Sequence, residues 1–229
     1  MIILLYIAVI LIGYILGSIP FGVLISRRST KTDITQVGSG KIGMTNVLRT
    51  AGKKAAALAL VLDMSKGIVA VILTGLIFEG SHVVWYGEGL LWTTRLAQVL
   101  AALAAIMGHN WSIFLKFKGG RGVATFIGGL FAMCWPAAVF GGGTMLIVGF
   151  GTKYMSLGSI IGAVAAFIIL IALTILQPYH LAYVFYAMIC AIFIFIRHRD
   201  NIVRLVSGTE RKLGEKVRVD NAPAPSDHK

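Results

Sequence analysis

Long apolar runs, separated by short polar segments, dominate the 229-residue chain. An apolar helix of about 20 residues is long enough to cross the hydrocarbon core of a membrane. The pattern predicts about seven spans, near residues 2–26, 55–78, 95–116, 123–134, 136–151, 157–176 and 180–197. The expected fold class is therefore all-α, a polytopic membrane protein with about seven transmembrane helices, of which the fourth and fifth are short.

The charges of the connecting segments predict which side of the membrane each one faces. Segment 27–54 holds seven Lys and Arg and one acid, and the tail from Arg197 holds eight Lys and Arg and five acids. The connection 79–94 has no Lys or Arg, although it contains Glu79 and Glu88. Because cytoplasmic loops are rich in Lys and Arg, the basic segments are expected inside and the acidic connection outside.

This assignment decides how region 123–151 is interpreted, because hydropathy allows either one tilted helix or two short ones. A single helix would leave the basic tail outside, whereas two helices broken near Trp135-Pro136 return it to the cytoplasm. We therefore expect two helices, an outside N-terminus and a cytoplasmic C-terminus. Residues 1–210 form a single transmembrane catalytic domain in this interpretation, and 211–229 form a flexible polar tail.

Composition supports a membrane protein and narrows its partners. The chain is 57% apolar and 13% charged, with a mean hydropathy of +0.85, whereas soluble domains are about 45–50% apolar and about 25% charged. A soluble globular domain and intrinsic disorder are both excluded. The net charge of +12 is best explained by topology and by anionic ligands, and no nucleic-acid partner is expected.

Three of the basic segments share a composition suited to phosphate. Segments 37–49, 117–125 and 197–205 combine Lys or Arg with a hydroxyl or amide residue and, in the first two segments, with glycines. Glycines let backbone N–H groups converge on an anion, and Arg can bind phosphate through two hydrogen bonds. A helix predicted from Val123, directly after Gly122, adds its positive N-terminal dipole. One basic loop is explained by topology and anionic lipid; three on one side predict a phosphate site.

Other polar residues have structural interpretations. Asp63 and Lys66 share a helix face inside the second span and are expected to pair. His109 is expected to make an interhelical hydrogen bond, and Ser156 to cap a helix. The stretch from Ser18 to Gly22 should break the first helix at Pro20. No metal-binding motif accompanies the five histidines or the two cysteines, Cys134 and Cys190, so neither a metal nor another cofactor is predicted.

Several motifs, met in order from about residue 13 to 210, resemble the bacterial acyl-phosphate:glycerol-3-phosphate acyltransferases. They are Ser18-Ile-Pro-Phe-Gly, Gly-Ser-Gly-x-x-Gly-x-Thr-Asn-Val-Leu-Arg at 38–49, Gly108-His109, Phe117-Lys-Gly-Gly-Arg-Gly-Val-Ala-Thr125, Arg197-His-x-x-Asn-Ile-x-Arg-Leu205 and Gly208-x-Glu210. Members of that family transfer a fatty acyl group from acyl phosphate to the 1-hydroxyl of glycerol 3-phosphate. The products are lysophosphatidic acid and phosphate.

The resemblance implies a set of site residues and a location. Candidate catalytic residues are Ser39, Arg49, His198 and Asn201, while Glu210 looks structural. Candidate substrate- and phosphate-binding residues are Gly38, Gly40, Thr45, Asn46, Lys118, Gly119, Gly120, Arg121, Gly122, Ser156 and Ser159. The chain departs from the family at Lys41, Met44 and Arg121, where Asn, Ala and Lys are usual. The implied location is the bacterial inner (plasma) membrane, as a multi-pass protein with its active site facing the cytoplasm.

The chemistry expected from these residues is direct acyl transfer. An acyl phosphate is already activated, so the protein needs mainly to align the hydroxyl and stabilise charge. Glycerol 3-phosphate, acyl phosphate and membrane lipids are the expected partners, with no acyl-enzyme and no metal. Either His198 or a phosphate oxygen of the substrate takes the hydroxyl proton.

Two alternative functions fit this sequence less well. The glycerolipid acyltransferases with an H-x-x-x-x-D box are excluded, because residues Gly87, Phe114, Phe185 and Val203 stand where the Asp would follow a histidine. An anion or organophosphate transporter is the remaining alternative. Such a protein should carry charge near mid-membrane in several helices and an inverted repeat, and neither is clear in this chain.

Overall fold

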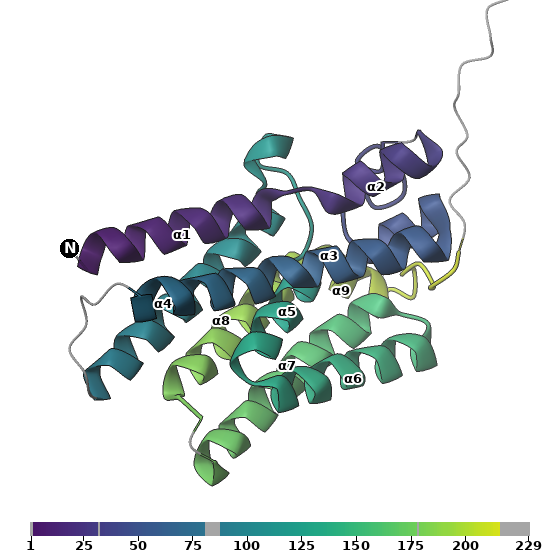
Figure 1. Ribbon diagram of the computed structural model, residues 1–229. Helices are drawn as coiled ribbons and strands as arrows, with labels where there is room; N and C mark the ends of the chain where they lie inside the picture. Colours follow the sequence, from purple (N-terminus) through teal and green to yellow (C-terminus); the bar gives the residue numbers. More distant parts are fainter. Residues whose placement is uncertain (1, 32, 81–87, 178, 216–229) are drawn as a thin grey trace, which may run out of the picture.

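The computed structural model is a bundle of helices, described for residues 2–31, 33–80, 88–177 and 179–215 (Figure 1). Its elements are α1 (Ile2–Ser18), α2 (Phe21–Thr30), α3 (Met44–Gly80), α4 (Glu88–Asn110), the 3-10 turn η1 (Ile113–Leu115), α5 (Val123–Met133), α6 (Trp135–Thr152), α7 (Met155–Leu176), α8 (Leu181–Arg197) and α9 (Arg199–Val206). These ranges contain no β-strand, which confirms the all-α fold class.

Several helices have the length and composition of membrane spans. Within the described ranges, four segments qualify: α1 with α2 taken as Ile2–Thr30, α3, α6 and α7. A fifth qualifies if α8 and α9, bent by 60°, count as one span, and α5 is apolar but shorter. The acidic connection predicted to lie outside falls partly at 81–87, outside the described residues.

The two helices expected in region 123–151 are present. α5 ends at Met133 and α6 begins at Trp135, with Cys134 between them in a non-helical conformation (φ −153°, ψ 84°). Pro136 lies in the first turn of α6, where its missing N–H removes no helical hydrogen bond. The first span is also broken as predicted, between Ser18 and Phe21.

The predicted span 95–116 is wrong at its end, because α4 stops at Asn110. The chain then makes a tight turn in which the Phe117 N–H donates to the Ser112 carbonyl (2.9 Å) and the Ser112 N–H donates to Lys118 (3.2 Å). The Ser112 hydroxyl also donates to the Ser18 carbonyl in the α1–α2 break (2.5 Å). These local bonds favour a turn although Ile113 and Phe114 are apolar.

Close helix packing brings the polar loops to one end of the bundle. Gly13 and Gly17 of α1 lie so near the α4 backbone that an added Cβ would be 2.3 Å and 2.0 Å from carbonyl oxygens there. α6 and α7 form an antiparallel pair with a similar glycine contact at Gly158. In Figure 1, α2, the beginning of α3, α9 and the segment after α9 all lie at the right-hand end.

Candidate active site

A polar cavity of about 280 Å³ lies at this end of the bundle. It is bounded by the loop before α3, the start of α7, α9 and residues 207–215, which we call the C-terminal strap. Its lining residues are Gly38, Ser39, Lys41, Thr45, Arg49, Arg121, Met155, Ser156, Ser159, Asp200, Asn201, Arg204, Glu210, Arg211 and Leu213. Residues far apart in the sequence, from all three predicted phosphate loops, therefore meet in one cavity.

Asn46 holds the first loop in shape. Its side chain is 2% exposed, and its oxygen accepts a hydrogen bond from the Ser39 N–H (3.3 Å). Its Nδ2 group contacts three loop carbonyls at 2.9–3.0 Å, those of Ile34, Val37 and Lys41. Since this amide is fully engaged within the loop, Asn46 positions Ser39 and Lys41 at the cavity.

Two glycines allow the same loop its curvature. Gly38 and Gly40 adopt φ values of 66° and 65°, which are left-handed and strained for other residues. Gly38 lines the polar cavity, whereas Gly40 does not. Gly40 therefore shapes the loop, and Gly38 also leaves its backbone accessible to a ligand.

Some residues of the second loop, 117–125, face the cavity, and others are buried in the protein interior. Gly119 and Gly120 are buried, and a Cβ on Gly120 would lie 2.0 Å from His109 Nε2. The Gly120 N–H donates to the His109 carbonyl (2.9 Å). Lys118 is exposed and lines neither the polar cavity nor the apolar cavity described below. Of this loop's two predicted cations, only Arg121 reaches the site.

His109 itself belongs to a buried charged cluster that supports the second loop. Asp63 and Lys66 are 1% and 3% exposed, and Lys66 Nζ lies 2.6 Å from Asp63 Oδ1. His109 Nδ1 lies 3.5 Å from the same Asp63 oxygen and 3.4 Å from Lys66 Nζ. The predicted ion pair and the interhelical contact of His109 are both confirmed. The support that His109 provides beneath Gly120 was not predicted from the sequence and is seen only in the packing.

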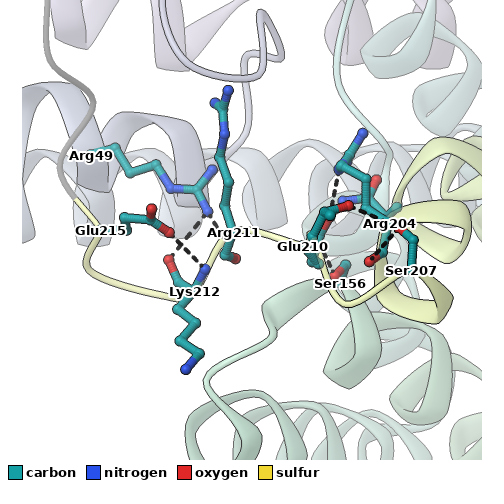
Figure 2. Close-up of polar contacts among 10 residues, drawn as sticks. Arg49, Ser156, Arg204, Ser207, Glu210, Arg211, Lys212 and Glu215 are labelled. Atoms are coloured by element: carbon teal, nitrogen blue, oxygen red, sulfur yellow. Dashed lines mark hydrogen bonds and ion pairs between the residues drawn. The ribbon is translucent and has the colours of Figure 1, made fainter.

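Glu210 organises the third part of the site (Figure 2). One carboxylate oxygen accepts hydrogen bonds from Ser156 Oγ (2.8 Å) and Asn201 Nδ2 (2.6 Å), and the other accepts one from Arg204 Nε (2.7 Å). Burial raises the pKa of Glu210, but these three hydrogen bonds and the Arg204 charge outweigh burial and hold it below its usual value. Glu210 therefore connects α7 to α9. The prediction that Ser156 caps a helix is wrong, because Ser156 lies inside the first turn of α7 and its hydroxyl donates to Glu210.

Three groups around the cavity keep unsatisfied hydrogen-bonding capacity among the described residues. Arg49 Nη2 lies 3.4 and 3.5 Å from two carbonyls of the C-terminal strap, beyond the usual range, and Arg49 Nε has no partner. Arg121 Nε and Asn201 Oδ1 are also buried without one. Burial, together with the charges of Arg204, Arg197 and Arg49, lowers the pKa of Arg121 to about 10 despite the opposing effect of Glu210. An anion would relieve this repulsion.

An apolar cavity of about 400 Å³ adjoins the polar one. It runs between α3, α5 and α6, where Leu60, Met64, Ile127, Phe131, Val139 and Leu146 line it. The two cavities share Ser39, Lys41, Thr45, Arg121, Met155 and Ser159. A molecule with a charged head and an apolar tail would fit across this shared wall.

His198 and Gly122 line the apolar cavity instead of the polar one. His198 is 1% exposed, and its Nδ1 lies 2.7 Å from the Ile194 carbonyl. Because a carbonyl only accepts, Nδ1 carries the hydrogen, and any proton that His198 takes up goes to Nε2. Gly122 adopts φ 78° at the N-terminus of α5, so α5 begins directly after the second loop, as predicted.

Comparison with known proteins identifies the family of this site. The family model described as glycerol-3-phosphate acyltransferase matches residues 7–208. The chain belongs to this family. Glycerol-3-phosphate acyltransferase 3 of Dehalococcoides mccartyi is 51% identical over 211 residues, covering 92% of this chain and 96% of the relative. Glycerol-3-phosphate acyltransferase of Caulobacter vibrioides is 41% identical over 215 residues, covering 94% and 91%.

Solved structures agree with the assignment to the glycerol-3-phosphate acyltransferase family. The chain resembles the crystal structure of PlsY, an integral membrane glycerol 3-phosphate acyltransferase, in its glycerol 3-phosphate form, with a TM-score of 0.76 and 32% identity. That match covers 91% of this chain and 96% of PlsY. The lysophosphatidic acid form of PlsY gives a TM-score of 0.74 at 31% identity, covering 90% and 94%. The chain is thus an acyltransferase of the membrane.

Proposed function

We propose that this acyltransferase moves a fatty acyl group from acyl phosphate to the 1-hydroxyl of glycerol 3-phosphate. Lysophosphatidic acid and inorganic phosphate are the products. The observation that carries the proposal is the shared wall between the two cavities, where Arg121 Nε has no hydrogen-bond partner among the described residues. This arrangement suits a donor whose phosphate and acyl chain need opposite surroundings.

The polar cavity holds the phosphate groups in this proposal. Arg49 and Arg121 supply guanidinium groups, which bind phosphate through charge-assisted hydrogen bonds. Ser39 and Thr45 add hydroxyl donors to the same cavity. The Asn201 Oδ1 atom, buried and unpartnered among the described residues, is a ready acceptor for a hydroxyl of glycerol 3-phosphate.

The apolar cavity holds the acyl chain, and the reacting carbonyl lies where the cavities meet. There the 1-hydroxyl oxygen attacks the carbonyl carbon, and the bond from that carbon to the phosphate oxygen breaks. Phosphate leaves with the electron pair, and Arg121 stabilises its charge. The hydroxyl proton passes to His198 Nε2 or to a phosphate oxygen of the substrate. No covalent acyl-enzyme and no metal enter this scheme.

We further propose that the site faces the cytoplasm of a bacterial cell (inner) membrane crossed by about seven spans. Residues of the C-terminal strap and of all three basic loops line the polar cavity. The positive-inside rule assigns such basic segments to the cytoplasm. Glycerol 3-phosphate would then reach the cavity from water, and acyl phosphate from the membrane.

The decisive experiment measures phosphate release from palmitoyl phosphate and glycerol 3-phosphate by the purified protein in micelles. We expect wild-type protein to release phosphate and form lysophosphatidic acid. Arg121→Ala should lower kcat/KM by at least about 100-fold, as removal of a charge-stabilising donor does elsewhere. Lys118→Ala is the matched control from the same loop and should stay within about twofold, because exposed side chains outside a site contribute little.

Two results would reject the proposal: no phosphate release by the wild-type protein, or equal release by wild type and Arg121→Ala. A stable acyl-protein adduct would reject only direct transfer. These outcomes separate the identity of the reaction from its route.

A further inference from the structure

A third hollow, which we call the lateral groove, lies beside the site and is the largest of the three at about 900 Å³. It runs between the beginning of α3 and the end of α6. Its lining residues are Val37, Met44, Leu48, Arg49, Thr50, Gly52, Lys53, Ala56, Ala57, Leu60, Leu146, Phe150, Leu213 and Gly214. Phe150 is 59% exposed, so the groove opens on the outer surface of the bundle.

The lateral groove is continuous with both cavities of the site. It shares Arg49 and Leu213 with the polar cavity. It shares Met44, Leu60 and Leu146 with the apolar cavity. A molecule lying in the groove therefore touches the residues that bound the head site and the tail site at once.

The chemistry of the lateral groove matches one kind of ligand. Its described lining holds two cations, Arg49 and Lys53, and no acid, while most of the remainder is apolar. Both cations lie near the break in α3 at Gly52 (φ 83°, ψ −178°). A Cβ at Gly52 would meet nothing within 4 Å, so the break is not forced by close packing there. The groove thus offers positive charge at one end and an apolar body.

We infer that the lateral groove binds a single-chain lipid with a phosphate head group, and that Lys53 is its outer phosphate contact. The inference rests on the proposed function: acyl phosphate, as the donor of that reaction, enters through this groove, and lysophosphatidic acid, as its product, leaves through it. Charge complementarity and continuity with the two cavities favour this occupant over a neutral lipid. Arg49 receives the phosphate from Lys53 as the head group moves into the polar cavity.

The test uses two pairs of neighbouring residues, one member of each pair in the groove. Lys53 lines it, whereas Lys54 is equally an exposed lysine and does not. Ala57 lines it, whereas Leu58 is 51% exposed and does not. Each groove variant therefore has a control in which the same residue is introduced one position away.

Lys53→Gln should raise the KM for palmitoyl phosphate about fivefold, as expected for one cation near a phosphate at a membrane surface. Ala57→Trp, which fills the groove, should raise it at least about tenfold. The KM for glycerol 3-phosphate and the Tm should stay unchanged. Hexadecyl phosphate, an unreactive single-chain probe, should inhibit wild type, and its inhibition constant should rise in parallel. Lys54→Gln and Leu58→Trp should behave as wild type.

Equal KM values for palmitoyl phosphate in each groove variant and its control would overturn the proposal that the lateral groove binds the lipid. The proposed acyltransferase reaction would be unaffected by that result. An equal rise in the KM for glycerol 3-phosphate would also overturn the groove proposal, since the change would then act on the catalytic cavity. A wild-type protein that releases no phosphate from palmitoyl phosphate would instead reject the proposed function itself.

Discussion

Two groups of charged side chains lie near the second loop, and they differ in how their charges are satisfied. Beneath Gly120, Asp63 and Lys66 form a buried ion pair at 2.6 Å, with His109 against both. On the cavity side, Arg49 and Arg121 each keep an Nε without a partner among the described residues. The interior cluster is neutralised by the chain itself, whereas the cavity holds positive charge in excess.

The difference separates structural charges from charges that await a ligand. A buried ion without a counterion is costly, so a chain keeps one only where something else supplies the opposite charge. Figure 2 shows one paired and one unpaired arginine in the cavity: Arg204 bonds to the Glu210 carboxylate, while Arg49 reaches only carbonyls of the C-terminal strap. Substitutions in the two groups should therefore affect different properties, stability in one and activity in the other.

The largest effect is expected from breaking the interior pair. Asp63→Leu leaves Lys66 buried without its counterion, and we expect the free energy of unfolding to fall by about 3–5 kcal/mol. Replacing both residues, as Asp63→Leu with Lys66→Met, should recover most of that loss because no buried charge is stranded. Thermal unfolding in detergent measures both. If the single variant melts at the wild-type temperature, the cluster is not structural.

Sequence alone predicted much of this fold because membrane spans follow from apolar length. The break at Cys134 was predicted from Pro136 and from the basic segments before and after region 123–151, which two helices place on the same side of the membrane. The turn at 111–118 did not follow, since Ile113 and Phe114 are as apolar in an exposed turn as in a helix. Only the hydrogen bonds of Ser112 distinguish the two.

The loops that form the site were predictable from the sequence, but which of their side chains face the cavity was not. Lys118 and Arg121 are three residues apart in one basic loop, and composition does not say which one faces the cavity. That choice is made by Gly119 and Gly120 packing on His109, at the end of the preceding helix α4. Asn46 was likewise predicted to bind substrate, yet its amide group hydrogen-bonds to carbonyls of its own loop. The folded conformation of each loop, which composition does not reveal, carries this information.

A smaller effect on free energy, but a large one on rate, is expected at Arg49. Arg49→Ala should lower kcat/KM by about 100-fold or more, since it removes a phosphate-binding cation. Its contacts at 3.4 and 3.5 Å contribute little to stability, so the Tm should stay within about 2 °C of wild type. Arg204→Ala replaces another arginine of the same cavity and is the matched control; it should instead lower the Tm. Equal losses of stability in both variants would show that Arg49 is as structural as Arg204.

A loss of stability smaller than that from breaking the interior pair is expected at Glu210, the carboxylate that holds the third part of the site. Glu210→Gln weakens the acceptor for Ser156, Asn201 and Arg204, and we expect about 1–3 kcal/mol less stability at pH 7. Glu215→Gln is an exposed control on the C-terminal strap. Thermal unfolding of both variants and wild type across pH 3–8 measures the difference.

The pH dependence follows from the lowered pKa of Glu210 in the folded protein. A carboxyl group with a depressed folded-state pKa stabilises fully above its unfolded pKa, about 4.3 for Glu. That stabilisation is lost as the pH falls through the folded-state pKa. The gap in Tm between wild type and Glu210→Gln should therefore be constant from pH 6 to 8 and shrink below about pH 4.3. A gap that widens on acidification would mean that Glu210 is protonated in the native state and that Arg204 is as unpaired as Arg49.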